Sequence, residues 1–179
     1  YDDRGDEVKA QVNAVKNGVA EVIFIADVKS LGTRVYDFVP SETPCAVESS
    51  ISINDLTMEN QKYIVELNRR GNIASIVDKQ LGNKEILSEP ISLGLFNYTG
   101  SKEWPAWEMN YAQANKPADR MPEIVSIDII ENGAARVAFK VVQKDDRSTF
   151  TNIVALADGS NLVEVYSEIE WQSLRTMAK

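Results

Sequence analysis

The stretch "IVSIDIIENGAARVAFKVV", Ile124 to Val142, contains two runs rich in β-branched residues on either side of an Asn-Gly pair. Such runs are typical of half-buried strands. Asn and Gly tolerate the positive φ angles of a tight hairpin turn. We therefore predict an antiparallel hairpin with strands over 124–130 and 135–142.

The same pattern of strand, short turn and strand returns along the chain. The pairs are 8–16 with 19–28, 62–67 with 73–78, and 150–157 with 162–171. In the first pair, the second run is the more apolar and is expected to be the more buried. A helical period sustained over a dozen residues is missing. The sequence therefore predicts an all-β fold built from antiparallel sheets.

The segment "RGNIASIVDKQLGNKEIL", residues 70–87, combines a strand with a following turn. Side chains alternate between the two faces of a strand. Strict alternation would place Ile73, Ser75 and Val77 on one face of the sheet, and Ile76 on the other.

A domain boundary is expected in "VPSETPCAVESS", Val39–Ser50, where prolines, serines and glutamates interrupt the strand pattern. We assign residues 1–45 to a small β unit that ends a preceding β domain, and residues 46–179 to a larger sandwich. The last predicted strand reaches Trp171 with no closing partner, so we expect the larger unit to be truncated at its C-terminus.

The composition argues against several classes of partner. The net charge is −8 and the basic residues are scattered, so the chain offers no basic stripe for nucleic acid. The longest apolar run, near Val22–Ala26, is far too short to cross a bilayer. We therefore expect neither nucleic acid nor a membrane as a partner.

Histidine is absent and Cys45 is the single cysteine. The chain thus lacks the base of Ser-His-Asp and Cys-His relays, the commonest zinc ligand, and any internal disulfide. We accordingly predict no catalytic residue and no metal ligand within these 179 residues.

The long interruption Asn97–Pro122 holds "GSKEWPAWEMNYAQ", which is rich in aromatic residues. Loops of this length often serve a function. Aromatic rings with a few polar groups can hold a sugar, although large aromatics more often pack into a core. The spacing of Glu103 and Glu108 does not fix the separation that a catalytic carboxylate pair requires. The candidate substrate-binding residues are Tyr98, Trp104, Trp107, Glu108 and Tyr111.

The segment Gly71–Leu87 resembles a hairpin, "G-x-I-x-S-I-x-D-K-x-x-G-x-E-x-L", in the C-terminal region of family 38 glycoside hydrolases, the α-mannosidases. Three further landmarks occur in that family's order. They are Val28–Pro40, similar to its "P-x-L-G-Y-x-x-Y" strand, Trp104–Glu108, similar to "W-D-A-W-[DE]", and Val163–Trp171, similar to a late strand ending in an acidic residue and Trp. The resemblance runs from Lys29 to Trp171.

The sequence departs from these patterns at several positions. Lys29, Ser30 and Thr33 differ from the commoner residues of the upstream strand, and Pro105 stands where Asp is usual. A polar contact made by that Asp is therefore not expected here. Trp104, Trp107 and Glu108 match the family pattern and carry over as candidates for the surface that faces the catalytic domain.

The resemblance implies a β-supersandwich related to the galactose-mutarotase-like domains, preceded by a small β unit. It also implies that the zinc site and the aspartate nucleophile lie in an upstream α/β domain of the same polypeptide. The full enzyme would hydrolyse α-mannosidic bonds in mannose-containing glycans with retention, through a covalent glycosyl-enzyme. This chain would support that domain, help to wall its cleft, and be inactive alone.

Two other classes of function stay open. A freestanding carbohydrate-binding module would use Trp104, Trp107 and Tyr98 as a binding platform. An immunoglobulin-like adhesion domain would be a smaller sandwich and would leave the tryptophan loop unexplained.

Overall fold

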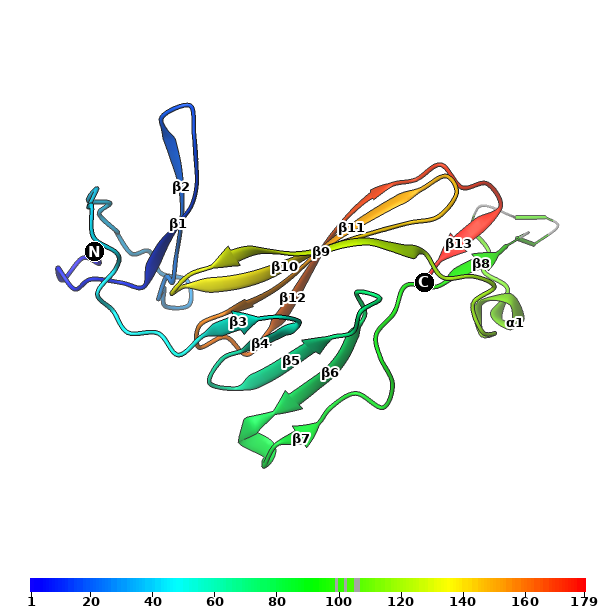
Figure 1. Ribbon diagram of the computed structural model, residues 1–179, viewed down its shortest axis with the longest axis horizontal. Helices are drawn as coiled ribbons and strands as arrows, with labels where there is room; N and C mark the ends of the chain where they lie inside the picture. Colours follow the sequence, from blue (N-terminus) through cyan, green and yellow to red (C-terminus); the bar gives the residue numbers. More distant parts are fainter. Residues whose placement is uncertain (99, 102, 105–106) are drawn as a thin grey trace.

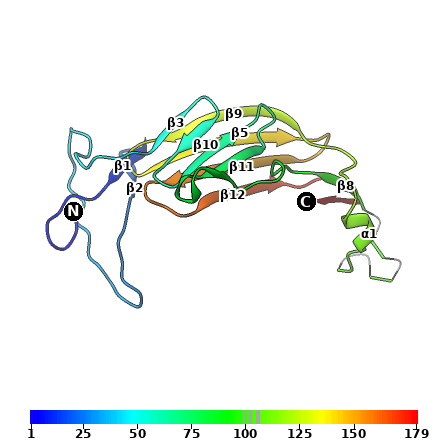
Figure 2. The same ribbon diagram turned by 90° about the horizontal axis from the view of Figure 1, so that it is seen from below.

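The computed structural model describes residues 1–98, 100–101, 103–104 and 107–179. The prediction of an all-β antiparallel fold is confirmed: two sheets face each other across a core, with a hairpin at one end and a small two-stranded sheet at the other (Figures 1 and 2). In the described residues, no helix is long and apolar enough to cross a membrane.

The larger hairpins form a four-stranded sheet in the order β12-β11-β10-β9. The strands are β9 (Glu123–Asn132), β10 (Arg136–Lys144), β11 (Thr149–Ala157) and β12 (Val163–Glu170). All three pairings are antiparallel, as predicted. Gly159, in the turn before β12, has a φ of 69°, which explains the glycine there.

The facing sheet has five strands in sequential order. They are β3 (Ser52–Asn54), β4 (Thr57–Glu59), β5 (Tyr63–Leu67), β6 (Ile73–Asp78) and β7 (Lys84–Glu85), with a 3₁₀ turn over Lys79–Leu81 before β7. The carboxylate of Asp78 starts that turn by accepting hydrogen bonds from the backbone N–H groups of Gln80 and Leu81, at 2.8 and 3.2 Å. Strands β3 and β4 are too short to produce a clear sequence pattern.

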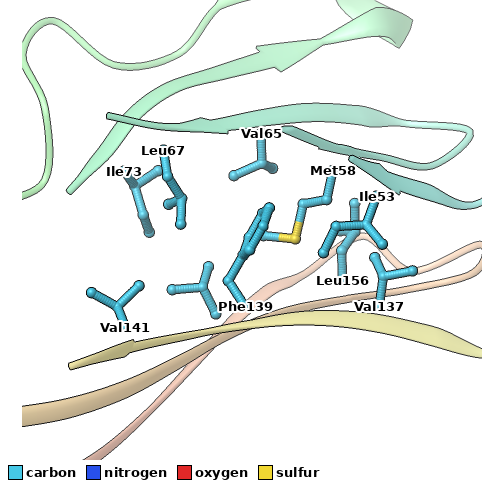
Figure 3. Close-up of a cluster of buried hydrophobic side chains, with 10 residues drawn as sticks. Ile53, Met58, Val65, Leu67, Ile73, Val137, Phe139, Val141 and Leu156 are labelled. Atoms are coloured by element: carbon cyan, nitrogen blue, oxygen red, sulfur yellow. The ribbon is translucent and has the colours of Figure 1, made fainter. Parts of the chain in front are cut away.

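The core lies between the two sheets, and Figure 3 shows its side chains meeting from both layers. Phe139 of β10 is fully buried at its centre, opposite Val65 of β5 and Met58 of β4. The other buried members are Ile53, Leu67, Ile73, Val137, Val141, Val154 and Leu156. This continuous apolar layer makes the two sheets a sandwich.

A β-bulge changes the face assignment predicted for β6. The register with β5 shifts so that Val65 pairs with Ile76 but Leu67 pairs with Ile73. Directly paired residues share a face, so Ile73 and Ile76 both face the core. The prediction that Ile73 lies on the same face as Val77 is therefore wrong, because one extra residue at the bulge breaks the alternation.

The N-terminal hairpin consists of β1 (Ala10–Lys16) and β2 (Val19–Phe24). Its predicted turn is confirmed by φ angles of 52° at Asn17 and 78° at Gly18. The expected burial of the second strand is wrong: Val19, for example, is 71% exposed. The hairpin projects from the end of the sandwich, so no described layer covers it (Figure 1).

The strand expected within Val28–Pro40 is also not formed. This segment is irregular apart from an isolated bridge between Tyr36 and Asp2. Arg34 holds this segment against the N-terminus, because its guanidinium is ion-paired with the carboxylates of Asp2 and Asp3. Side-chain contacts replace the backbone ladder that a strand would have.

The side chains of Gln11 and Lys9 join the N-terminal unit to turns of the sandwich. The Gln11 side-chain oxygen accepts hydrogen bonds from the backbone N–H groups of Ala135 and Arg136, both at 2.9 Å. Lys9 is ion-paired with Asp158, which also accepts a hydrogen bond from Ser49 at 3.1 Å. The boundary at residue 45 stays a prediction.

A small sheet at the opposite end pairs β8 (Leu95–Asn97) with β13 (Thr176–Ala178). The pairing extends past β13, since Gly94 and Lys179 exchange backbone hydrogen bonds of 2.8 and 3.0 Å. The C-terminal segment is thereby brought back beside the tryptophan-rich loop (Figure 1).

Candidate functional site

The tryptophan-rich loop leaves the sandwich at the end of β8 and returns beside the same strand. The backbone N–H groups of Asp119 and Arg120 donate to the carbonyl of Leu95, at 3.0 and 3.1 Å. The Asp119 carboxylate accepts a 2.7 Å hydrogen bond from the N–H of Asn97. The two ends of the loop are therefore fixed to one strand.

Asp119 has a second partner, Lys116, whose ammonium lies 2.7 Å from its carboxylate. This hydrogen bond, followed by the bond from the Asn97 N–H, holds the pKa of Asp119 below its ordinary value. Asp119 is thus ionised at neutral pH and acts as the anchor of the loop base.

The two tryptophans predicted to face a ligand stack on each other. The ring centroids of Trp104 and Trp107 are 5.5 Å apart and the planes are inclined by 20°. Both rings stay exposed, at 53% and 81%. A turn produces the stack, since the N–H groups of Trp107 and Glu108 donate to the Trp104 carbonyl at 3.4 and 3.0 Å. Among the described residues, these rings are not part of the core.

Tyr98 links this turn to the sandwich. Its hydroxyl donates to the carbonyl of Glu108 and accepts from the N–H of Asn110 at 3.3 Å. Its own N–H donates to the carbonyl of Arg175 at 2.8 Å, next to β13. Tyr98 therefore positions the loop, and its hydroxyl is already engaged.

Tyr111 begins a short α-helical turn, α1 (Tyr111–Ala114), after the cap residue Asn110. Its ring is exposed and its hydroxyl accepts a 2.9 Å hydrogen bond from the Asn115 side chain. A shallow hollow of about 440 Å³ lies between this ring and Glu108, Met109 and Ser101. The structure thus brings Tyr98, Glu108 and Tyr111 to one surface, beside the tryptophan stack.

The two glutamates of the loop, Glu103 and Glu108, are both exposed. Exposed carboxylates of this kind lack the burial that prepares a general acid. Pro105, where the family pattern differs, lies outside the described residues, as does Ala106 beside it.

A buried polar network next to the loop was not predicted from the sequence. The carboxylate of Asp145 accepts hydrogen bonds from the N–H groups of Arg147 and Ser148, from the Ser173 hydroxyl, and from the Arg120 guanidinium. Burial opposes its ionisation, but these four donors outweigh that effect and lower its pKa to about 2. The only sequence signal was the pair Asp145-Asp146, which is typical of a surface turn.

Two cavities adjoin this network and share the wall formed by Ser173, Leu174 and Thr176. The larger, about 650 Å³, is also lined by Tyr98, Gly100, Trp171 and Arg175. The smaller, about 240 Å³, is also lined by Asn97, Arg120, Asp145, Asp146 and Arg147. Both open beside the base of the tryptophan loop.

The described residues contain no group of three or more Asp, Glu, Cys or His side chains that could hold a metal ion. The chain also has no histidine. The described residues thus do not fit a zinc site, and the place of the expected zinc stays a prediction.

Comparison with known families gives the class of protein. Residues 58–179 match the family "Glycosyl hydrolases family 38 C-terminal domain". The match covers more than half of the chain, and the chain belongs to this family. No curated protein matches the sequence.

The predicted resemblance to the C-terminal region of family 38 is thus confirmed. The landmarks at Gly71–Leu87, Trp104–Glu108 and Val163–Trp171 all lie within the matched span. The upstream landmark, Val28–Pro40, lies outside the matched span. The binding roles of Tyr98, Trp104, Trp107, Glu108 and Tyr111 stay predictions.

Proposed function

We propose that this chain is the non-catalytic C-terminal β-sandwich region of an α-mannosidase. It would support an α/β catalytic domain of the same polypeptide, which would hold the zinc ion and the nucleophile. The family membership supports the association with a glycoside hydrolase. The absence of histidine from the sequence supports chemistry performed elsewhere, because histidine is the commonest zinc ligand.

The proposed second role is to line the substrate cleft with the loop over 98–111. The observation that carries this role is the exposed stack of Trp104 on Trp107, held on a loop whose two ends are fixed. Leaving two indole rings in water is unfavourable unless a ligand or a neighbouring domain covers them. A sugar ring or the rim of the catalytic domain would supply that cover.

Kinetics of the full-length enzyme would test this role. Trp107→Ala should lower kcat/KM for mannose oligosaccharides by about tenfold, because a stacking contact of about 1–1.5 kcal/mol would be lost. Its thermal stability should change little, because the ring is exposed. Tyr166→Ala is the matched control, since Tyr166 is an exposed aromatic on β12. Equal kinetics for the two variants would contradict the cleft-lining role.

The 179-residue chain should not hydrolyse an α-mannoside by itself. Turnover by the purified chain, abolished by Glu108→Gln, would refute the division of labour. The competing carbohydrate-binding module predicts saturable glycan binding by the isolated chain that is lost in Trp104→Ala or Trp107→Ala.

A further inference from the structure

We propose that the two cavities beside β13 form a second sugar subsite, which holds a neutral hexose of the glycan away from the bond being cleaved. The proposal rests on the proposed function, because it concerns a more distant part of the same substrate. Its position is given by Tyr98, which contacts the tryptophan turn through Glu108 and lines the larger cavity. The tryptophan stack and the cavities are therefore neighbours.

The larger cavity supplies an aromatic wall. Trp171 is 37% exposed, and its ring is held edge-to-face against the buried Phe150, with centroids 6.1 Å apart. Phe150 thereby fixes one side of the indole, and the other parts of the ring are accessible. A hexose has an apolar face of C–H groups that packs on such a ring. The volume of about 650 Å³ lies within the range of ligand sites.

The walls also offer both donors and acceptors. Neither guanidinium of Arg147 or Arg175 is hydrogen-bonded or ion-paired within the described part of the chain. The carboxylate of Asp146 is equally without a partner there. Sugar hydroxyls both donate and accept hydrogen bonds, so they match a site with free guanidinium and carboxylate groups.

Charges of both signs line the cavities. Asp145 and Asp146 line the smaller cavity with Arg120 and Arg147, whereas Arg175 lines the larger one. Asp145 already engages Arg120 at 3.1 Å. The free charges are then two guanidinium groups and one carboxylate. A neutral ligand with several hydroxyl groups can pair with free groups of either sign, because a hydroxyl both donates and accepts hydrogen bonds.

The subsite is rigid before any ligand arrives. The hydroxyl of Ser173 is held by Asp145 at 2.9 Å and by Ser148 at 2.8 Å. The carbonyl of Arg175 is held by the N–H of Tyr98 at 2.8 Å. The turn between β12 and β13 is therefore fixed at both ends, which reduces the entropy lost on binding.

Binding of an α-linked mannobiose to the 179-residue chain, followed by amide and indole NMR shifts, would test the subsite. We expect saturable shifts at the Trp171 indole and at the Arg175 and Thr176 amides. The double variant Arg147→Ala/Arg175→Ala should weaken binding about tenfold or more, because hydrogen bonds from charged groups would be lost. Lys16→Ala, at the tip of the distant hairpin β1–β2, should bind normally.

The double variant removes side chains that have no partner in the described structure, so its melting temperature should match that of the parent chain. Affinity should also change little with added salt, as expected for a neutral ligand. Absence of saturable shifts, or shifts confined to Trp104 and Trp107 and unaffected in the double variant, would overturn the subsite. Neither result would affect the proposed support role, which falls only if the isolated chain shows turnover.

Discussion

Lys9 and Asp158 form an ion pair although 149 residues separate them in the chain. Lys9 precedes the N-terminal hairpin, and Asp158 lies in the turn between β11 and β12. The Asp158 carboxylate also accepts hydrogen bonds from Gln61, at 2.8 Å, and from Ser49, at 3.1 Å. One buried carboxylate thus connects the N-terminal unit, the boundary segment Val39–Ser50 and both layers of the sandwich.

Asp158→Ala should lower the free energy of unfolding by about 1–3 kcal/mol, because three donors lose their acceptor in a largely buried place. Urea denaturation monitored by tryptophan fluorescence would measure the change. Glu89→Ala, which removes an exposed carboxylate with no partner in the described structure, should change stability by less than about 0.5 kcal/mol. Similar values for the two variants would show that Asp158 does not join the units.

Gly71 lies in the turn after β5, where the backbone packs closely against the opposite sheet. Its φ is 77°, and an added Cβ would lie 2.3 Å from a methyl carbon of Val141 in β10. Gly71→Ala should therefore destabilise the fold by about 2–4 kcal/mol, through left-handed strain plus overpacking. Gly82→Ala separates the two effects, since Gly82 has a φ of 74° and nothing within 4 Å of the added Cβ.

Thermal melts of both glycine variants would check this account. Gly82→Ala should cost only the backbone strain, about 1–2 kcal/mol. If Gly71→Ala were no worse than Gly82→Ala, the close approach of the turn to β10 would be wrong.

The bulge between β5 and β6 predicts which apolar side chains of β6 support the core. Ile73 is a buried member of the core cluster, whereas Val77, which alternation places on the same face, is not. Ile73→Ala should cost about 2–4 kcal/mol, and Val77→Ala about 1 kcal/mol or less. Chemical denaturation distinguishes the two, and equal losses would support the unbulged register.

The hairpins of the fold could be predicted, although Asn132 and Gly133, in the turn between β9 and β10, do not adopt the expected positive φ angles. Asn17-Gly18 and Gly159 occupy the positive φ angles that the flanking strands require. The bulge at β6 could not be predicted, because it depends on the partner strand and not on the residues of β6 themselves. The prediction that β2 is buried was wrong for a similar reason, because an apolar strand is buried only if another layer covers it.

The candidate site could also be predicted only in part. The aromatic composition of the loop identified Trp104 and Trp107, because two large rings are unusual in an irregular segment. The network of Asp145, Arg120 and Ser173 brings together residues from three distant parts of the chain. No pattern within a short stretch of sequence indicates that these residues lie close together, because the pairing of β8 with β13 brings them into contact.

Asp145 should make the stability of the chain depend on acidic pH. Its pKa is about 2 in the folded chain, against an ordinary value of 3.8. A carboxyl whose pKa is lowered by folding contributes its full stabilisation above the pKa of the unfolded chain. That contribution is lost as the pH falls from about 5 through the folded value near 2, because protonation removes the negative charge that the four hydrogen-bond donors stabilise.

The variant Asp145→Asn is expected to be less stable than the parent chain at pH 7 and to show a shallower loss of stability between about pH 5 and pH 2. The two stability curves should converge near pH 2, where the parent carboxyl is also neutral. Asp2, whose pKa is likewise about 2, keeps a residual slope in both proteins. Urea titrations at a series of pH values would measure the curves. Parallel curves over the whole range would mean that the Asp145 carboxyl titrates alike in the folded and unfolded chains, and that its hydrogen bonds do not hold the turn between β12 and β13.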